Sequence, residues 1–192
     1  MKKIKFVYLF AGFLVITLFS CEKKLSAPPC NVDFKLIGYS NTIFERSNTS
    51  YSSQVQRIAI NDTVEYSKLM IYVDAIIQPI ENVQCDPIEN ILTNIKNITI
   101  QCKQNYNDNF SENDTLNSIV LVRYYEGAGG ELTLEPINLT ELLESTQRCM
   151  KYYDFYLNEP PSLSGYYSFI ISFTDNENNQ YITETYPVFI NL

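Results

Sequence analysis

The chain has 192 residues and contains neither histidine nor tryptophan. Without histidine, Ser-His-Asp and Cys-His catalysis are excluded, because no other side chain transfers protons equivalently near neutral pH. Most transition-metal sites are also excluded, because histidine is their commonest ligand. No two cysteines have the C-x-x-C spacing of a zinc site. We therefore expect no metal site, no cofactor and none of the familiar hydrolase mechanisms.

Motifs of other catalytic classes are also missing. Residues 38–42 (Gly-Tyr-Ser-Asn-Thr) lack the final glycine of a G-x-S-x-G nucleophile elbow, and no glycine-rich phosphate loop occurs. Glycoside hydrolysis needs only two carboxylates, but 22 acidic residues single out no particular pair. We expect the protein not to be an enzyme, with a histidine-independent glycosidase as the least favoured alternative.

Lysine and arginine are scarce as well. The chain has 14 of them against 22 aspartate and glutamate residues, which gives a net charge of −8. The basic residues are scattered, whereas nucleic-acid binding needs clustered ones that replace the counterions of phosphates. We therefore expect no nucleic-acid partner.

The N-terminus has the layout of a secretory signal. Lys2, Lys3 and Lys5 precede an apolar run from Phe6 to Phe19. The run is shorter than the roughly 20 apolar residues that a transmembrane helix needs. An export signal is therefore the better interpretation.

Cys21 follows directly on this run, and Leu18, Ser20 and Cys21 resemble the lipobox of bacterial lipoproteins. The resemblance implies cleavage before Cys21 and acylation of its thiol with palmitate-type lipid. An ordinary signal peptide beside an unrelated cysteine is the alternative. We expect residues 1–20 to be a lipoprotein signal peptide, 21–31 a lipidated tether and 32–192 a single domain with a net charge near −11, because three lysines leave with the signal.

The cysteines other than Cys21 are even in number. Acylation of Cys21 leaves the four disulfide candidates Cys30, Cys85, Cys102 and Cys149. An exported protein meets an oxidising compartment, so we expect two disulfides, and four cysteines allow three connectivities. Pairing Cys85 with Cys102 closes the shorter loop and would leave Cys30 with Cys149.

Alternating apolar and polar residues predict strands over most of the mature chain. Residues 66–77 are apolar on both faces, which is typical of a central strand. Residues 40–55 are expected to form a loop, 89–94 a helical turn and 138–143 a short helix capped by Asn138. The other predicted strands are 32–36, 57–60, 98–103, 119–124, 150–157, 167–174 and 181–190.

These elements predict an all-β domain, an antiparallel immunoglobulin-like β-sandwich with one or two short helices. Residues 165–169 (Gly-Tyr-Tyr-Ser-Phe) resemble the entry to a late immunoglobulin strand, where a tyrosine forms a corner. Residues 175–180 resemble a calcium loop only superficially, because Gln180 occupies the position that needs glycine. We expect a hairpin turn there.

Tyrosine pairs recur at residues 124–125, 152–153 and 166–167. Adjacent residues of a strand point to opposite faces, so each pair is expected to supply one core ring and one surface ring. Outward tyrosine rings can stack on sugars. Glycan binding is therefore an alternative function.

The chain resembles the small outer-membrane lipoproteins of Bacteroidota, a family of unknown function. Cys21, Cys30, the strand at 98–100 and residues 152–169 carry the likeness. It implies an outer-membrane lipid anchor and a sandwich fold but no catalytic residues. Two Asp-Thr-apolar triplets resemble the O-glycosylation motif of exported Bacteroidota proteins and make Thr63 and Thr115 candidate acceptors.

The sequence thus predicts a lipid-anchored outer-membrane protein that binds or scaffolds an unknown protein or glycan. Surface-exported members of the family often carry acidic residues after the lipid cysteine, whereas here Glu22 is followed by Lys23 and Lys24. Whether the domain faces the periplasm or the cell surface is therefore left open. The main alternative is an accessory glycan-binding lipoprotein of a polysaccharide-uptake system.

Overall fold

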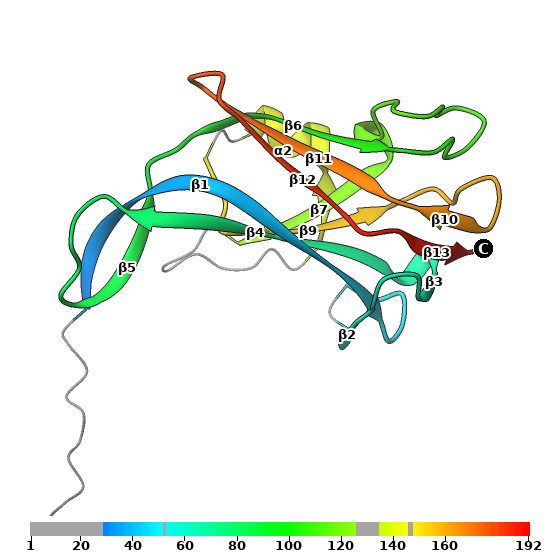
Figure 1. The fold of residues 1–192 in the computed structure, drawn as a ribbon, viewed down its shortest axis with the longest axis horizontal. Coiled ribbons are helices and arrows are strands. Elements are labelled where there is room, and N and C mark those ends of the chain that lie inside the picture. The colour runs from blue at the N-terminus through cyan, green and yellow to red at the C-terminus, as the bar shows by residue number, and fades with distance from the viewer. Residues whose placement is uncertain (1–28, 52, 126–134, 146–147) are drawn as a thin grey trace, which may run out of the picture.

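The computed structural model describes residues 29–51, 53–125, 135–145 and 148–192. This part of the chain is mainly β, with one α-helix, α2 (Leu139–Ser145), and two short 3₁₀ helices, η1 (Tyr66–Lys68) and η2 (Asn117–Ile119). Nearly all strand pairs are antiparallel; the exceptions are β1 with β5 and β13 with β3. The predicted all-β, antiparallel class is confirmed (Figure 1).

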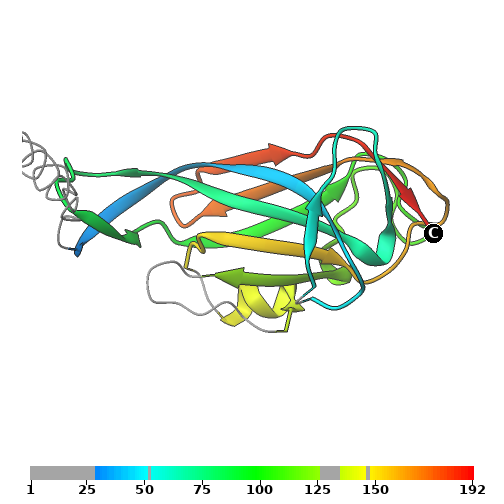
Figure 2. The same cartoon turned by 90° about the horizontal axis from the view of Figure 1, so that it is seen from below.

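The larger sheet contains most of the first half of the chain. Its central strands run in the order β1-β4-β9-β7, and Figure 2 shows them side by side. Smaller strands extend both edges, with β8 beside β7 and both β2 and β5 beside β1. The strands of this sheet are β1 (Pro29–Arg46), β2 (Val55–Arg57), β4 (Leu69–Pro79), β5 (Asp86–Ile91), β7 (Val120–Tyr125), β8 (Ile137–Asn138) and β9 (Tyr152–Leu157).

The second layer consists of two three-stranded sheets, β12-β11-β6 and β10-β13-β3. They are linked by the chain, because β10 leads into β11 across Ser168 and β12 leads into β13 across residues 185–187. The strands of this layer are β3 (Thr63–Glu65), β6 (Ile95–Cys102), β10 (Gly165–Tyr167), β11 (Phe169–Asp175), β12 (Gln180–Glu184) and β13 (Val188–Asn191).

The core lies between the two layers. In β11 the side chains of Phe169, Ile171 and Phe173 are fully buried and alternate with the half-buried Ile170, Ser172 and Thr174, as the period-two pattern predicts. Phe173 stacks on Tyr39 of β1 with ring centroids 3.7 Å apart and lies 5.4 Å from Tyr153 of β9. These contacts join the layers into a sandwich.

Several predicted strands are confirmed, and β4 is indeed central, since it lies between β1 and β9. The predicted helix near 138–143 is α2. Just before β11, the Tyr167 hydroxyl donates a 2.7 Å hydrogen bond to the Leu163 carbonyl. The predicted final strand is divided into β12 and β13, with Pro187 in the break.

The predicted strand 57–60 is a strand only at Arg57, which ends β2. Two other local predictions are wrong. Residues 40–46 were expected in a loop but continue β1. Ser40 and Thr42 face away from the core, whereas Ile43 is buried in it and Asn41, on the same face as Ile43, donates a hydrogen bond to Thr183 of β12. Residues 89–94 were expected to form a helical turn, but 86–91 form β5, which pairs in parallel with the start of β1. Residues 29–31, assigned to the tether, therefore also lie in a sheet.

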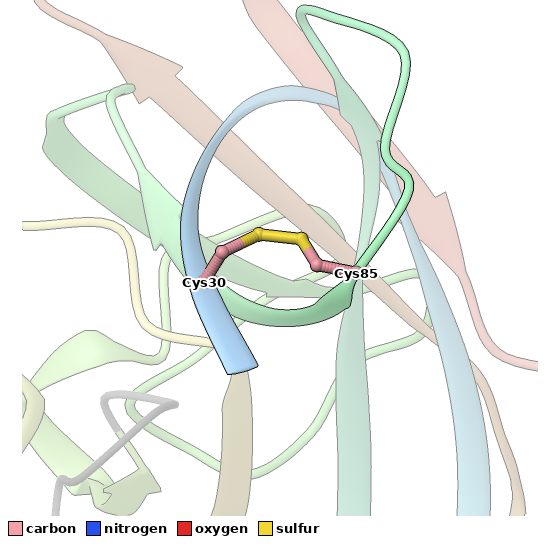
Figure 3. The surroundings of a disulfide bond; sticks show 2 residues. All are labelled: Cys30 and Cys85. Atoms are coloured by element: carbon pink, nitrogen blue, oxygen red, sulfur yellow. A yellow bond between two sulfur atoms is a disulfide. The ribbon is translucent and has the colours of Figure 1, made fainter. Parts of the chain in front are cut away.

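The disulfide lies where β1 and β5 begin. Cys30 bonds to Cys85, which lies just before β5, so the bond fastens the start of β1 to the connection between β4 and β5 (Figure 3). The expected pairs Cys85–Cys102 and Cys30–Cys149 are wrong. The parallel pairing of β1 with β5, which the sequence did not predict, brings Cys30 and Cys85 together.

Cys102 and Cys149 are buried free thiols. The Cys149 backbone N–H donates to the carbonyl of Thr93, which lies just before β6, whereas Cys102 ends β6. At about 3.3 Å per residue, the strand holds the two cysteines more than roughly 20 Å apart. A disulfide needs Cα atoms within about 7 Å, so these two cannot pair in this fold.

Candidate binding surface

The outer face of the larger sheet carries a row of tyrosines from three neighbouring strands. Tyr72 of β4, Tyr152 of β9 and Tyr125 of β7 point away from the core, and we call these three rings the tyrosine ladder. The strand register explains the row: Tyr125 lies directly opposite Tyr152, and Tyr72 lies diagonal to it, opposite Asp154.

The rings of the ladder contact one another. Tyr152 stacks on Tyr72 and on Tyr125, with centroids 5.7 Å apart in both pairs and interplanar angles of 26° and 21°. These distances fit offset stacking. All three side chains are half-buried, so part of each ring reaches solvent. Burial, followed by the charge of Asp74, raises the pKa of Tyr72, which stays a neutral phenol at physiological pH.

A carboxylate lies beside the ladder. Asp74 is directly opposite Tyr152 in the register, and its Oδ1 atom is buried without a hydrogen-bond partner among the described residues. Burial raises the pKa of Asp74. Nearby, the Lys151 ammonium pairs with Glu89 at 2.9 Å and lies 5.9 Å from the centroid of the Tyr152 ring. The ladder therefore combines aromatic rings with polar groups of both charges.

The other half of the same face is closed by the chain between β1 and β2. Arg123 pairs with Asp154 at 2.7 Å and donates a hydrogen bond to the Tyr51 carbonyl. Arg46 lies between the rings of Tyr51 and Tyr156, 4.9 and 4.8 Å from their centroids. These five side chains are largely buried, and they hold residues 47–51 against the sheet.

The outcome for the tyrosine pairs agrees with the sequence. Tyr153 and Tyr167 are buried and Tyr124 packs against the core, while the second ring of each pair reaches the surface. The ladder itself was not predicted, because the contact between Tyr125 and Tyr152 depends on cross-strand register. Tyr72 was expected to be buried, and no local signal distinguishes it from a core residue.

The other candidate residues lie apart from the ladder. Thr63 begins β3 and Thr115 forms an isolated bridge with Gln101, and both are exposed, which would leave them open to a transferase. Cys21 lies outside the described residues. Among the residues described, no helix has the length and apolar character needed to cross a membrane, and no three potential metal-ligating side chains cluster.

Comparison of the chain with family profiles, curated proteins and solved structures found no match.

Proposed function

We propose that this protein is an exported, lipid-anchored binding domain of the bacterial outer membrane, with no catalytic role. The observation that carries the binding proposal is the tyrosine ladder. Tyrosine is enriched at binding surfaces because it combines a large apolar ring with a polar tip. The ladder is built on the centre of a sheet and its rings hold one another in place, so little side-chain entropy is lost when a partner binds.

The anchor proposal rests on the N-terminal sequence. Cleavage of the signal before Cys21 would leave a lipidated cysteine close in sequence to Pro29, where β1 begins. The same motif is the basis on which we propose that the chain belongs to the small Bacteroidota lipoproteins. We also propose that Thr63 and Thr115 are O-glycosylated, because both residues are exposed. Protease treatment of intact cells distinguishes the two orientations, since only a surface-exposed domain would be digested.

We also infer that the sandwich is immunoglobulin-like. The order β1-β4-β9-β7 in one layer and β6-β11-β12 in the other corresponds to strands ABED and CFG of a constant-type immunoglobulin domain. The Tyr167 hydroxyl bonded to the Leu163 carbonyl corresponds to the tyrosine corner at the start of strand F. Domains of this type commonly serve as binding modules.

A second candidate function is glycan binding as an accessory lipoprotein of a polysaccharide-uptake system. It is favoured by the ladder, because the carbon-bound hydrogens of a sugar pack on aromatic rings while its hydroxyls need polar partners such as Asp74 and the Lys151–Glu89 pair. A panel of oligosaccharides, followed by calorimetry of any hit, tests this candidate. Binding of at least one saccharide supports it, and binding of none rejects it.

A further inference from the structure

A groove separate from the ladder lies where the turn between β11 and β12 approaches the connection from β4 to β6. Its volume is about 290 Å³, close to the lower end of small-molecule sites. Lys35, Ile80, Leu92, Asn94, Glu177 and Tyr181 contribute to its walls. We infer that this groove binds a neutral saccharide, an inference that rests on the proposed glycan function and assigns it a second site.

The walls of the groove are held by backbone hydrogen bonds. The Asn176 N–H donates to the Asn94 carbonyl at 3.1 Å, which ties the β11–β12 turn to the strand opposite. The Leu92 N–H donates to the Phe34 carbonyl at 3.1 Å, and the Ile80 N–H to the Asp33 carbonyl at 3.0 Å. The groove is therefore formed before a ligand enters, which lowers the entropic cost of binding.

The turn itself is fixed by one carboxylate. Asp175 accepts hydrogen bonds from the backbone N–H groups of Glu177 and Asn179, from the Asn179 side chain and from the Tyr181 hydroxyl. Burial of Asp175 opposes its ionisation, but the hydrogen bonds prevail and lower its pKa. This carboxylate is fully used within the turn, so the ligand must be bound by other groups.

Those other groups include both apolar and polar side chains, and a sugar needs both kinds of contact. Ile80 and Leu92 are 56% and 52% exposed and offer apolar surface for carbon-bound hydrogens. Asn94, Glu177 and Lys35 offer amide, carboxylate and ammonium groups for hydroxyls, which both donate and accept. A neutral saccharide fits better than an acidic one, because the two carboxylates of Asp175 and Glu177 outnumber the single ammonium of Lys35 along the walls.

The groove lies at the end of the domain that carries β5 and the Cys30–Cys85 bond, whereas the C-terminus lies at the opposite end (Figure 1). Eight residue steps separate Cys21 from Pro29 and can span at most roughly 28 Å. With Cys21 acylated, the groove is held near the membrane. Its saccharide can therefore be a free oligosaccharide or the headgroup of a glycolipid.

The test is amide NMR of the membrane-purified protein in detergent, titrated with neutral hexose and N-acetylhexosamine disaccharides and with a uronic acid. We expect a neutral disaccharide to shift the amides of residues 92–94 and 176–181, and the uronic acid to leave them unchanged. Leu92→Glu should weaken this binding at least tenfold, while Leu163→Glu, at the other end of the domain and still more exposed (73%), should not. The titration is then repeated with a glycolipid that carries the same sugar, in nanodiscs. Tighter binding of the glycolipid would identify a headgroup as the ligand, and tighter binding of the free disaccharide would identify a free oligosaccharide.

The outcomes separate this inference from the proposed function. Shifts confined to residues 72–74, 125 and 152 would keep glycan binding at the ladder and overturn the groove. Shifts confined to the groove would support the inference and reject the ladder as the glycan site. Leu92→Glu binding as tightly as the unchanged protein would overturn the groove, and absence of shifts with every saccharide would overturn both.

Discussion

The rings of Tyr152 and Tyr125 stack across β9 and β7 with their centroids 5.7 Å apart. Both residues come from tyrosine pairs in the sequence, and in both pairs the partner ring packs toward the core. The sandwich therefore uses one ring of each pair for its own stability and places the other on its outer face. Addition of Tyr72 completes a ladder that spans three strands, roughly 10 Å at the usual strand spacing.

The lipid anchor predicts where the protein is found in the cell. Cys21→Ala should release the protein from the membrane pellet and abolish incorporation of labelled palmitate, because the acylated thiol is lost. Ser26→Ala, in the same segment, should leave both unchanged. Retention of Cys21→Ala in the pellet would contradict the anchor.

The Cys30–Cys85 bond predicts a large effect on stability. It closes a loop with a sequence separation of 55 residues, and loop-closure entropy assigns such a bond about 4 kcal/mol. Cys30→Ser should lower the free energy of unfolding in denaturant by about that amount, whereas Asn31→Ser, at the next and exposed position, should change it by less than about 0.5 kcal/mol. Peptide mapping without reductant should recover Cys30 linked to Cys85; recovery of Cys85 linked to Cys102 would refute the fold at this end.

The Arg123–Asp154 pair predicts a contrast between buried and exposed ion pairs. Both side chains are about nine-tenths buried, so Arg123→Ala leaves an unpaired buried carboxylate and should cost about 3–5 kcal/mol. Lys103 forms an equally short pair with Glu184 at the surface, and Lys103→Ala should cost at most about 1 kcal/mol. If Arg123→Ala and Lys103→Ala lowered the free energy of unfolding by equal amounts in chemical denaturation, the buried pair would not be what holds residues 47–51.

The two free thiols predict that the stability of the fold depends on pH. Burial raises the pKa of Cys102 and of Cys149 to about 11 from an ordinary value of 9.0. The neutral thiols contribute stability that is complete below pH 9 and is lost as the pH rises from 9 toward 11, because the unfolded chain ionises first. The free energy of unfolding should fall over that interval. A thiol reagent at pH 8 should label neither cysteine in the folded protein and both in denaturant, and rapid labelling of the folded protein would contradict their burial.

The sequence predicts the parts of this fold that depend on local alternation. The strand over residues 167–174 was predicted because Phe169, Ile171 and Phe173 share one face, while the opposite face carries Ser168, Ser172 and Thr174. The strand over residues 40–46 was not predicted, because serine, asparagine and threonine at positions 40–42 are residue types that are typical of a loop. In the folded chain, the neighbouring β4 satisfies their backbone groups.

Features that depend on long-range pairing were not predictable from one sequence. Cys30 meets Cys85 only because β5 pairs in parallel with β1. The ladder likewise requires the register of β4, β9 and β7, since Tyr72, Tyr125 and Tyr152 are far apart in the chain. The tyrosine pairs indicated which rings face outward but not which rings meet.

The proposed binding role of the ladder is tested most directly by measuring saccharide affinity for two matched tyrosine variants. Tyr152→Ala removes the central ring of the ladder, whereas Tyr166→Ala removes a ring that is 53% exposed and contacts Phe189 elsewhere on the surface. Loss of one ring that stacks on a ligand costs roughly 1–3 kcal/mol on the aromatic platforms of proteins that bind single-stranded nucleic acid, and we expect a similar order here. We predict that, in calorimetry of the saccharide bound by the ladder, Tyr152→Ala weakens binding at least tenfold and Tyr166→Ala less than twofold. Equal affinities for both variants and the unchanged protein would contradict the account.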